Sequence, residues 1–207
     1  MMVLLFWRAV SMAVEDLYDA TAYVVSRAED WAIDPAAIVA NGSSAGAITV
    51  LQGEYGLCNR QPQSARLPEG FRYAGLISFA GAVLEPEGPL KWAQAPAPIQ
   101  FFHGNADSNV PYDKLVQQNM GFYGPASIAP SLDSLPSPYY FYTVDNAAHE
   151  IAIEPMNANR AEILIFLDRM VFGGQKLMLD SRVSRIGAPI LNKNFTLMDY
   201  VRKNFGL

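Results

Sequence analysis

The sequence contains few cysteine and histidine residues, and this shortage limits the disulfides and metal sites that the protein could form. Cys58 is the single cysteine, so an internal disulfide is excluded. We expect its side chain to be a small buried hydrophobic group and not a reactive thiol. Two histidines without clustered ligand spacing predict no metal centre. A glycine-rich phosphate loop and a dinucleotide fingerprint are absent too, so we expect no cofactor.

Basic clusters and long apolar runs are also missing. Twenty acidic residues outnumber fifteen basic ones, and the net charge of −5 argues against nucleic acid or a membrane surface as a partner. No apolar run approaches the ~18–20 residues of a transmembrane helix. Residues 1–7 are apolar but lack the basic start of a signal peptide, which predicts a strand remnant or the first turn of a helix. A cytoplasmic location is the default expectation, or a secreted or periplasmic one if the natural N-terminus lies upstream.

The composition is that of a globular domain. Half of the 207 residues are apolar and 17% are charged, and a chain of this length buries on the order of 70% of its unfolded surface. We divide it into a main domain, residues 1–172, and a C-terminal extension, residues 173–207. The extension is more polar, which predicts that it docks loosely.

Hydrophobic periodicity predicts alternating helices and strands. Helical spacing occurs over residues 12–28, from after Ser44 to about Leu57, and over 156–172. Short apolar segments at 37–40, 73–80, 98–103 and 139–144 predict strands. Nearly all-apolar strands separated by helices or long connections are typical of parallel strands buried on both faces. The fold class is therefore α/β, a three-layer α/β/α sandwich with a mostly parallel sheet.

The most informative motif is Gly42-Ser43-Ser44-Ala45-Gly46, which joins a predicted strand to a predicted helix. Gly-x-Ser-x-Gly in this position is typical of a nucleophilic serine on a strained turn, with small residues on either side so that the chains can pass closely. The N–H of Ala45, at the start of the helix, could then stabilise an oxyanion. An ordinary Gly/Ser turn is the alternative.

A serine hydroxyl needs a base beside it, and the two histidines are the candidates. His103 ends one predicted strand and His149 follows another. Ser44, Asp107 and His149 each lie just beyond the carboxyl end of a strand, so all three could meet at one edge of the sheet. Asp113 and Asp145 are rival acids, but Asp113 could simply cap a helix and Asp145 could belong to a turn. We expect Glu150 to be solvated.

These residues resemble the α/β-hydrolase fold, in which the triad occurs in the chain order Ser…Asp…His. Three motifs carry the resemblance: the serine turn Gly42–Gly46, the strand-end pattern His103, Gly104, Asp107, Val110, Pro111, and the small-residue run Asn146–His149. The resemblance implies that Ser44 is the nucleophile, that His149 is the general base and then acid, and that Asp107 orients His149. It also implies that His103 is structural.

Within that fold the chain is most similar to bacterial esterases and lipases that include feruloyl-esterase-like and acetyl-xylan-esterase-like carbohydrate esterases. Members of the fold normally have about four strands before the helix that leads to the serine turn. Here Ser44 comes too early for them, so the N-terminal strands are missing, together with the glycine-rich loop that gives the second oxyanion donor. We expect a truncated member with weak activity whose exposed sheet edge could form a homo-oligomer.

The sequence therefore predicts a serine hydrolase that cleaves small-molecule carboxylic esters through an acyl-enzyme, with acylated carbohydrates as one substrate class. Trp92, Tyr112 and Phe122 are candidate substrate-binding aromatics, although aromatic packing under a loop would explain them equally well. A serine peptidase of prolyl-oligopeptidase type is an alternative function. An inactive pseudo-hydrolase that serves as an interaction module is another.

Overall fold

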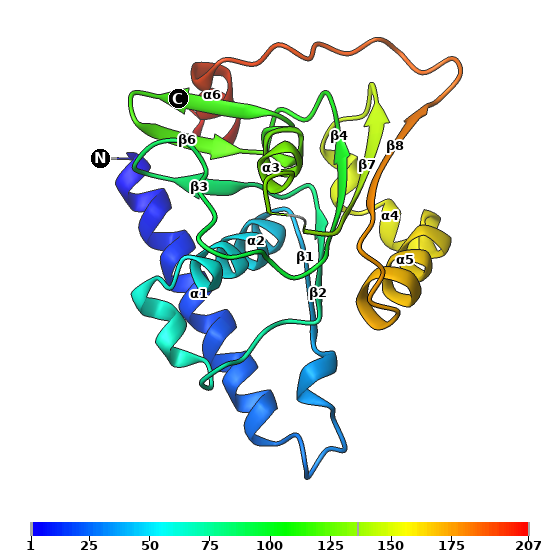
Figure 1. Cartoon of the computed structure of the whole chain (residues 1–207). Coiled ribbons are helices and arrows are strands. Elements are labelled where there is room, and N and C mark those ends of the chain that lie inside the picture. Colours follow the sequence, from blue (N-terminus) through cyan, green and yellow to red (C-terminus); the bar gives the residue numbers. More distant parts are fainter. Residues whose placement is uncertain (1, 136, 207) are drawn as a thin grey trace.

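The computed structural model describes residues 2–135 and 137–206 (Figure 1). Its centre is a parallel sheet of five strands in the order β1-β2-β4-β7-β8. The strands are β1 (Val39–Ser43), β2 (Gly75–Phe79), β4 (Ile99–Gly104), β7 (Tyr139–Asp145) and β8 (Met178–Ser184). The first four overlap or follow directly the segments that the sequence predicts as strands.

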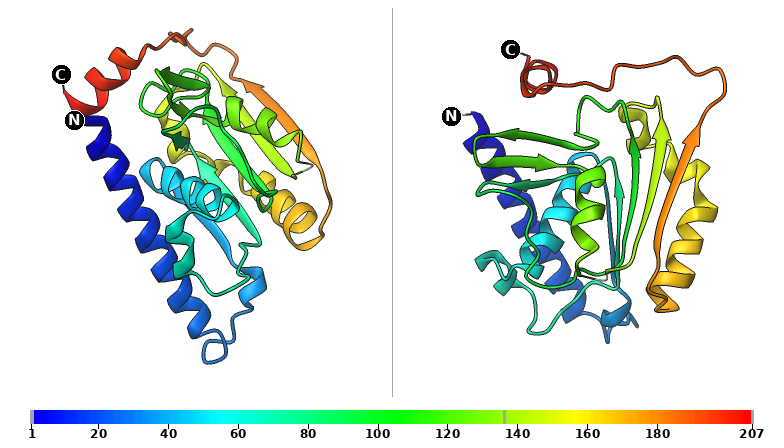
Figure 2. Two further views of the ribbon diagram at one scale, coloured as in Figure 1. Left: turned by 60° about the vertical axis from the view of Figure 1, so that its left-hand side comes forward. Right: turned by 45° about the horizontal axis from the view of Figure 1, so that its top comes forward.

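Helices cover both faces of this sheet. α1 and α2 lie on one face, and α4 and α5 lie on the other (Figures 1 and 2). The α-helices are α1 (Met2–Ser26), α2 (Ala45–Cys58), α3 (Pro125–Leu132), α4 (Pro155–Ala158), α5 (Arg160–Phe166) and α6 (Leu197–Phe205). Shorter turns are η1 (Pro35–Ala37), η2 (Pro62–Arg66), η3 (His149–Ala152) and the π-helical η4 (Leu167–Phe172). The predicted three-layer α/β/α sandwich is confirmed.

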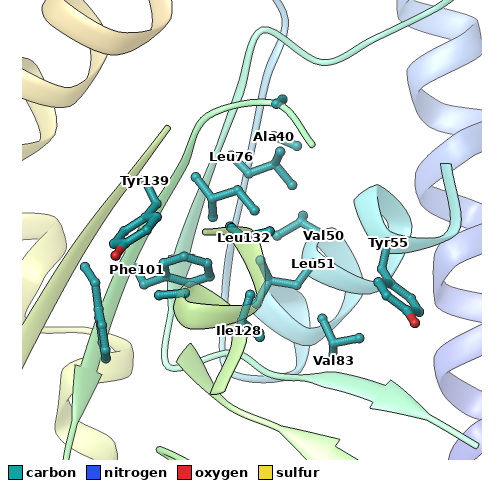
Figure 3. Packing of buried hydrophobic residues seen from close by; sticks show 14 of the residues in the cluster. Ala40, Val50, Leu51, Tyr55, Leu76, Val83, Phe101, Ile128, Leu132 and Tyr139 are labelled. Atoms are coloured by element: carbon teal, nitrogen blue, oxygen red, sulfur yellow. The ribbon is translucent and has the colours of Figure 1, made fainter. Parts of the chain in front are cut away.

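The core follows from strand alternation, because successive side chains of a strand point to opposite faces. Leu76 and Phe101 pack with Leu51 of α2 on one face (Figure 3). Their chain neighbours Ile77 and Phe102 pack on the opposite face, in a cluster that includes side chains of α5 and η4. Both faces are therefore filled by apolar side chains, as parallel strands require.

A second, smaller sheet was not predicted. Its antiparallel strands are β3 (Val83–Glu85), β5 (Lys114–Gln117) and β6 (Met120–Tyr123), in the order β3-β6-β5. Phe122 of β6 packs edge-to-face on Phe6 of α1 and on Tyr200 of α6. The small sheet is thus held between the two ends of the chain, which lie close together in all three views (Figures 1 and 2).

The first helix begins about ten residues earlier than the sequence predicts. α1 starts at Met2, so the apolar start of the chain is helix and not a strand remnant. Its buried stripe is Val10, Val14 and Tyr18, spaced four residues apart. Residues 1–7 are apolar on every side, which hides the helical period, so the sequence analysis left a strand remnant and the first turn of a helix as alternatives there; the helical turn is confirmed.

The C-terminal segment departs from the expected loose docking. β8 pairs with β7 over the whole of both strands, from Tyr139↔Met178 to Asp145↔Ser184. The chain then runs across the carboxyl ends of the strands to α6 (Figures 1 and 2). Tyr200 anchors α6 with 8% of its surface exposed. The domain boundary at residue 172 stays a prediction, but residues 178–184 are an integral strand of the sheet.

At the opposite side of the sheet, β1 pairs only with β2 among the described residues. It is therefore an edge strand whose outer backbone groups face away from the sheet, as the sequence analysis expects. Across residues 2–135 and 137–206, no helix combines the length and apolarity needed to cross a membrane.

One buried carboxyl group affects stability. Glu54 of α2 is fully buried, and its Oε1 accepts the backbone N–H of Ala97 at 2.8 Å. Its other oxygen has no hydrogen-bond partner within the described chain. Burial raises the pKa of Glu54, and the Ala97 N–H and the Arg72 charge offset this only in part. Cys58, also buried, lies 3.5 Å from the same Oε1, in agreement with the packing role predicted for it.

We predict that Glu54→Gln stabilises the protein near neutral pH. The native pKa is above the unfolded one, so the stability contributed by the protonated group is present below about pH 4.3 and is lost as the pH rises. Glutamine cannot ionise and avoids this loss. We expect the variant to gain on the order of 1 kcal/mol at pH 7 and much less at pH 5, measured by urea unfolding.

The matched control is Glu69→Gln, which alters an exposed carboxylate and should change stability little at either pH. If Glu54→Gln had the same effect at pH 5 and pH 7, or lost stability as the pH rose, the account of the buried carboxyl would be wrong.

Candidate functional site

Ser44 lies in the turn between β1 and α2, in a conformation that few non-glycine residues adopt. Its φ is 53° and its ψ is −117°. The backbone on either side fixes it, because the Ser44 N–H donates to the Phe79 carbonyl at 2.8 Å and its carbonyl accepts from Ile48 N at 2.9 Å. A conformation of this kind costs of order 1–3 kcal/mol and persists only where the surroundings enforce it.

The two flanking glycines have different roles. A Cβ on Gly42 would lie 2.2 Å from the carbonyl oxygen of Gly46, so this position requires glycine. A Cβ on Gly46 would meet nothing within 4 Å. The expectation that both neighbours must be small is therefore confirmed at Gly42 only, because the space beside Gly46 is open.

The three side chains predicted to act together are joined by hydrogen bonds. Ser44 Oγ lies 2.8 Å from His149 Nε2, and His149 Nδ1 lies 2.8 Å from Asp107 Oδ2. Each comes from a different strand end: Ser44 follows β1, Asp107 follows β4, and His149 follows β7. A parallel sheet brings these ends to one edge, which is why residues far apart in sequence meet here.

Asp107 is held as an ionised acceptor. Its side chain is fully buried, and its Oδ1 accepts the backbone N–H groups of Asn109 and Val110 at 2.8 and 3.1 Å. Burial alone would raise the pKa of this carboxyl, but hydrogen bonds from His103 and His149 outweigh burial and hold the pKa well below its usual range. An ionised Asp107 accepts from His149 Nδ1–H, which leaves Nε2 free to accept the Ser44 hydroxyl proton.

His103 occupies the structural position that the resemblance implies. It is completely buried, and its Nε2 lies 3.2 Å from the Val110 carbonyl and 3.4 Å from Asp107 Oδ2. Both neighbours are acceptors, so Nε2 carries the proton and donates to the loop that holds Asp107. Ser44 Oγ thus contacts His149, whereas His103 contacts the loop that carries Asp107.

The rival acids have other partners. Asp113 accepts the Ser127 hydroxyl, and Asp145 accepts from Asn105, Arg182 and Ser184. Glu150 is exposed and accepts the Ala148 N–H. Of these carboxylates, Asp107 is the one that contacts His149.

Ala45, the expected oxyanion donor, is the first residue of α2 and is exposed. N–H groups of the first helical turn have no partner within the helix, and the positive end of the helix dipole lies there. The donor and the serine thus share one turn. The described chain has no strand on the outer side of β1.

The three candidate substrate-binding aromatics all make packing contacts. Trp92 lies edge-on to the Tyr55 ring at 4.9 Å and donates to Ser131 Oγ at 3.0 Å. The Tyr112 hydroxyl bonds Thr143 Oγ1 at 2.9 Å. Phe122, expected in a loop, is buried in β6. These contacts explain the aromatics as packing residues, and substrate contact remains a prediction.

Two residues that hold the site together were not identified from the sequence. Ser43 Oγ donates to the Ala152 carbonyl at 2.6 Å, which ties β1 to the turn that begins at His149. Asn105 bonds to Asp145 and to the N–H of Asn146. Neither has a local sequence pattern, because each partner lies 40 or more residues away. Among the described residues, no group of three or more His, Cys, Asp or Glu side chains could hold a metal ion.

The two glycines give a matched pair of predictions. Gly42→Ala should destabilise the fold by about 1–3 kcal/mol, because the added methyl group overlaps the Gly46 carbonyl and distorts the serine turn. Gly46→Ala adds a methyl group in open space within the first turn of α2, and should leave stability unchanged or raise it by up to ~1 kcal/mol. Urea unfolding of both variants tests this; equal destabilisation by the two would contradict it.

The chain was compared with known proteins in three ways. It matches no protein-family model, no curated protein and no solved structure. The function of this site has to be inferred from the geometry of its own residues.

Proposed function

We propose that the chain is a serine hydrolase of the α/β-hydrolase type that cleaves carboxylic esters through an acyl-enzyme. The observation that carries the proposal is the continuous hydrogen-bonded series from Ser44 Oγ through both ring nitrogens of His149 to Asp107 Oδ2, with 2.8 Å at each step. A nucleophile, a base and an orienting acid in this arrangement define a triad by geometry, whatever the sequence order.

The first half of the reaction forms the acyl-enzyme. Ser44 Oγ attacks the ester carbonyl carbon while His149 Nε2 takes the hydroxyl proton. The imidazolium that forms is stabilised by the Asp107 carboxylate, which keeps its charge throughout. The tetrahedral intermediate then collapses, the C–O bond to the alcohol breaks, and His149 gives the proton to the leaving oxygen.

The second half repeats these steps with water. His149 takes a proton from a water molecule, which attacks the acyl carbon, and the ester bond to Ser44 breaks as the proton returns to Oγ. The acid leaves, and the hydrogen bond between Ser44 and His149 forms again. Ser44 and His149 are only partly buried, so water can reach the acyl-enzyme.

Oxyanion stabilisation is the weaker part of this site. The N–H of Ala45 can donate to the developing negative charge, but β1 is an edge strand and no second donor is assigned. Loss of one oxyanion donor lowers turnover by about 10²–10³-fold. We therefore expect slow turnover, best with activated esters whose leaving groups need little assistance.

Parallel strands and helices on both faces are compatible with the α/β-hydrolase fold, and the order Ser44, Asp107, His149 along the chain agrees with it. The finer proposal is a carbohydrate esterase acting on acetyl or feruloyl esters, which rests on sequence resemblance. A panel of acetylated and feruloylated sugars beside prolyl peptides separates it from a serine peptidase.

A pseudo-hydrolase that acts as an interaction module is the second candidate. The open edge of β1 favours it, because unpaired backbone groups there could bind a strand of a second copy of the chain. The two candidates differ in turnover, and an inactive chain that forms dimers through β1 would favour the module.

Replacement of the nucleophile tests the enzyme proposal. Ser44→Ala removes the attacking oxygen but leaves His149 and Asp107 in place, so turnover of p-nitrophenyl acetate should fall by about 10³-fold or more. Ser26→Ala is the matched control, since Ser26 lies exposed at the far end of α1, where its hydroxyl donates to the Tyr23 carbonyl. Hydrolysis that persists in Ser44→Ala at more than a tenth of the parent rate would refute the assignment.

A further inference from the structure

Asp145 is the last residue of β7 and precedes His149 by four positions. Three side chains from two separate parts of the chain donate to it. Its Oδ1 accepts from Asn105 Nδ2 at 2.5 Å and from Arg182 Nη1 at 3.0 Å, and its Oδ2 accepts from Ser184 Oγ at 2.7 Å. We refer to Asn105, Asp145, Arg182 and Ser184 as the Asp145 cluster.

Asn105 connects this cluster to the loop that carries Asp107. It lies two residues before Asp107, its surface is only 9% exposed, and its backbone N–H donates to the Val144 carbonyl at 3.1 Å. Its side-chain oxygen accepts the backbone N–H of Asn146 at 2.9 Å. One amide group therefore bonds both Asp145 and the first residue of the loop that leads to His149.

The loops of Asp107 and His149 are in close contact at this point. Ala106 N donates to the Ala147 carbonyl at 2.9 Å, and a Cβ on Gly104 would lie 2.3 Å from the same oxygen. Asn146 has a φ of 53°, a left-handed conformation that asparagine tolerates better than most residues. The path from Asp145 to His149 thus depends on contacts with residues 104–106.

The other half of the cluster comes from β8, and the residue that follows β8 makes a further contact. Arg182 and Ser184 hold Asp145 from the side opposite Asn105, and Arg185 forms an ion pair with Glu154, five residues after His149. Figure 1 shows β8 beside β7 along its whole length. The C-terminal segment therefore holds the chain on both sides of His149.

We propose that the Asp145 cluster is a positioning device for His149, through which Asn105 and the C-terminal strand β8 set the distance between His149 and Ser44. This inference rests on the proposed function. A displacement of about 1 Å in a catalytic group can lower turnover by about 10²-fold, so the contacts that fix this loop act on kcat. The C-terminal segment is then a working part of the site.

The electrostatics of Asp145 agree with this role. The Ser184 hydroxyl lowers the pKa of the Asp145 carboxyl most strongly, burial opposes it, and the Arg182 charge lowers the pKa further. Asp145 is thus an anion at neutral pH and can accept all three donors. Asp145, which the sequence left as a rival acid, acts on the reaction through the loop and not by contact with the imidazole.

The decisive experiment exchanges the two facing groups. Asn105→Asp sets a second carboxylate against Asp145 at hydrogen-bond distance, and should lower kcat about 10–100-fold with KM changed less than about twofold. Adding Asp145→Asn supplies an amide whose nitrogen, in place of Oδ1, can donate to the new carboxylate while its oxygen still accepts from Ser184. Arg182 loses its acceptor on this residue, so the contact between residues 105 and 145 is restored and that with Arg182 is not. The double variant should recover at least about tenfold in kcat, whereas a purely structural effect of each change would add and not compensate.

A second pair of variants tests the contact between β8 and Asp145 without placing a new charge in the interior. Ser184→Ala removes one exposed donor to Asp145 and should lower kcat about 3–10-fold. Ser181→Ala, on the same strand, loses a 3.4 Å contact with Tyr140 outside the cluster and should stay within about twofold of the parent. Thermal unfolding of all variants shows which of them fold.

The cluster can also be tested if the chain proves inactive. The two histidines of the chain give two imidazole spin systems by NMR, and the proton between His149 Nδ1 and Asp107 should appear at low field. Asn105→Asp should remove this signal and the double variant should restore it.

The proposal is overturned if Asn105→Asp leaves both kcat and the low-field proton unchanged, if a folded double variant shows no recovery, or if Ser184→Ala and Ser181→Ala behave alike. An inactive parent with a rescued low-field proton would reject the hydrolase and keep the positioning device.

Discussion

The left-handed backbone of Ser44 is the constraint on which the rest of the site depends. It turns the chain from β1 into α2 in one residue, and it places the hydroxyl at the carboxyl edge of the sheet beside the free N–H groups of the helix. Hydrogen bonds to Phe79 and Ile48 hold this conformation, and Gly42 is the residue that must make room for it. The position of the Ser44 hydroxyl therefore follows from the backbone geometry of this turn.

The parallel sheet then supplies the partners. In the order β1-β2-β4-β7 all four strands are parallel, so their carboxyl ends lie along one edge of the sheet. Asp107 and His149 reach Ser44 from neighbouring loops that contact each other closely at Gly104 and Ala147. Asp107 is buried but satisfied, with two backbone N–H groups and two imidazoles around it, and it therefore stays charged where an isolated carboxylate would not. The site combines a well-fixed acid and base with an exposed serine turn at an open sheet edge.

The sequence predicted the layers and the three central side chains because both depend on local patterns. Apolar strands such as 73–80 and the turn around Ser44 can be recognised without knowledge of the rest of the chain. β8 was missed because it is an edge strand whose outer residues, such as Asp180 and Arg182, are polar and exposed. The small sheet was missed because β5, with Lys114 and Gln117, has the same character. Asn105 and Ser43 could not be identified at all, because their roles depend on partners brought together only by the tertiary fold.

Covalent labelling of the native chain tests the central claim most directly. A fluorophosphonate reacts with a serine that a neighbouring base has activated, and it needs no knowledge of the natural ester. We expect a single adduct at Ser44, located by peptide mass spectrometry, and little or no adduct in His149→Gln, because the imidazole accepts the hydroxyl proton. Equal labelling of the parent and His149→Gln, or a parent chain in which Ser44 remains unmodified, would contradict the account.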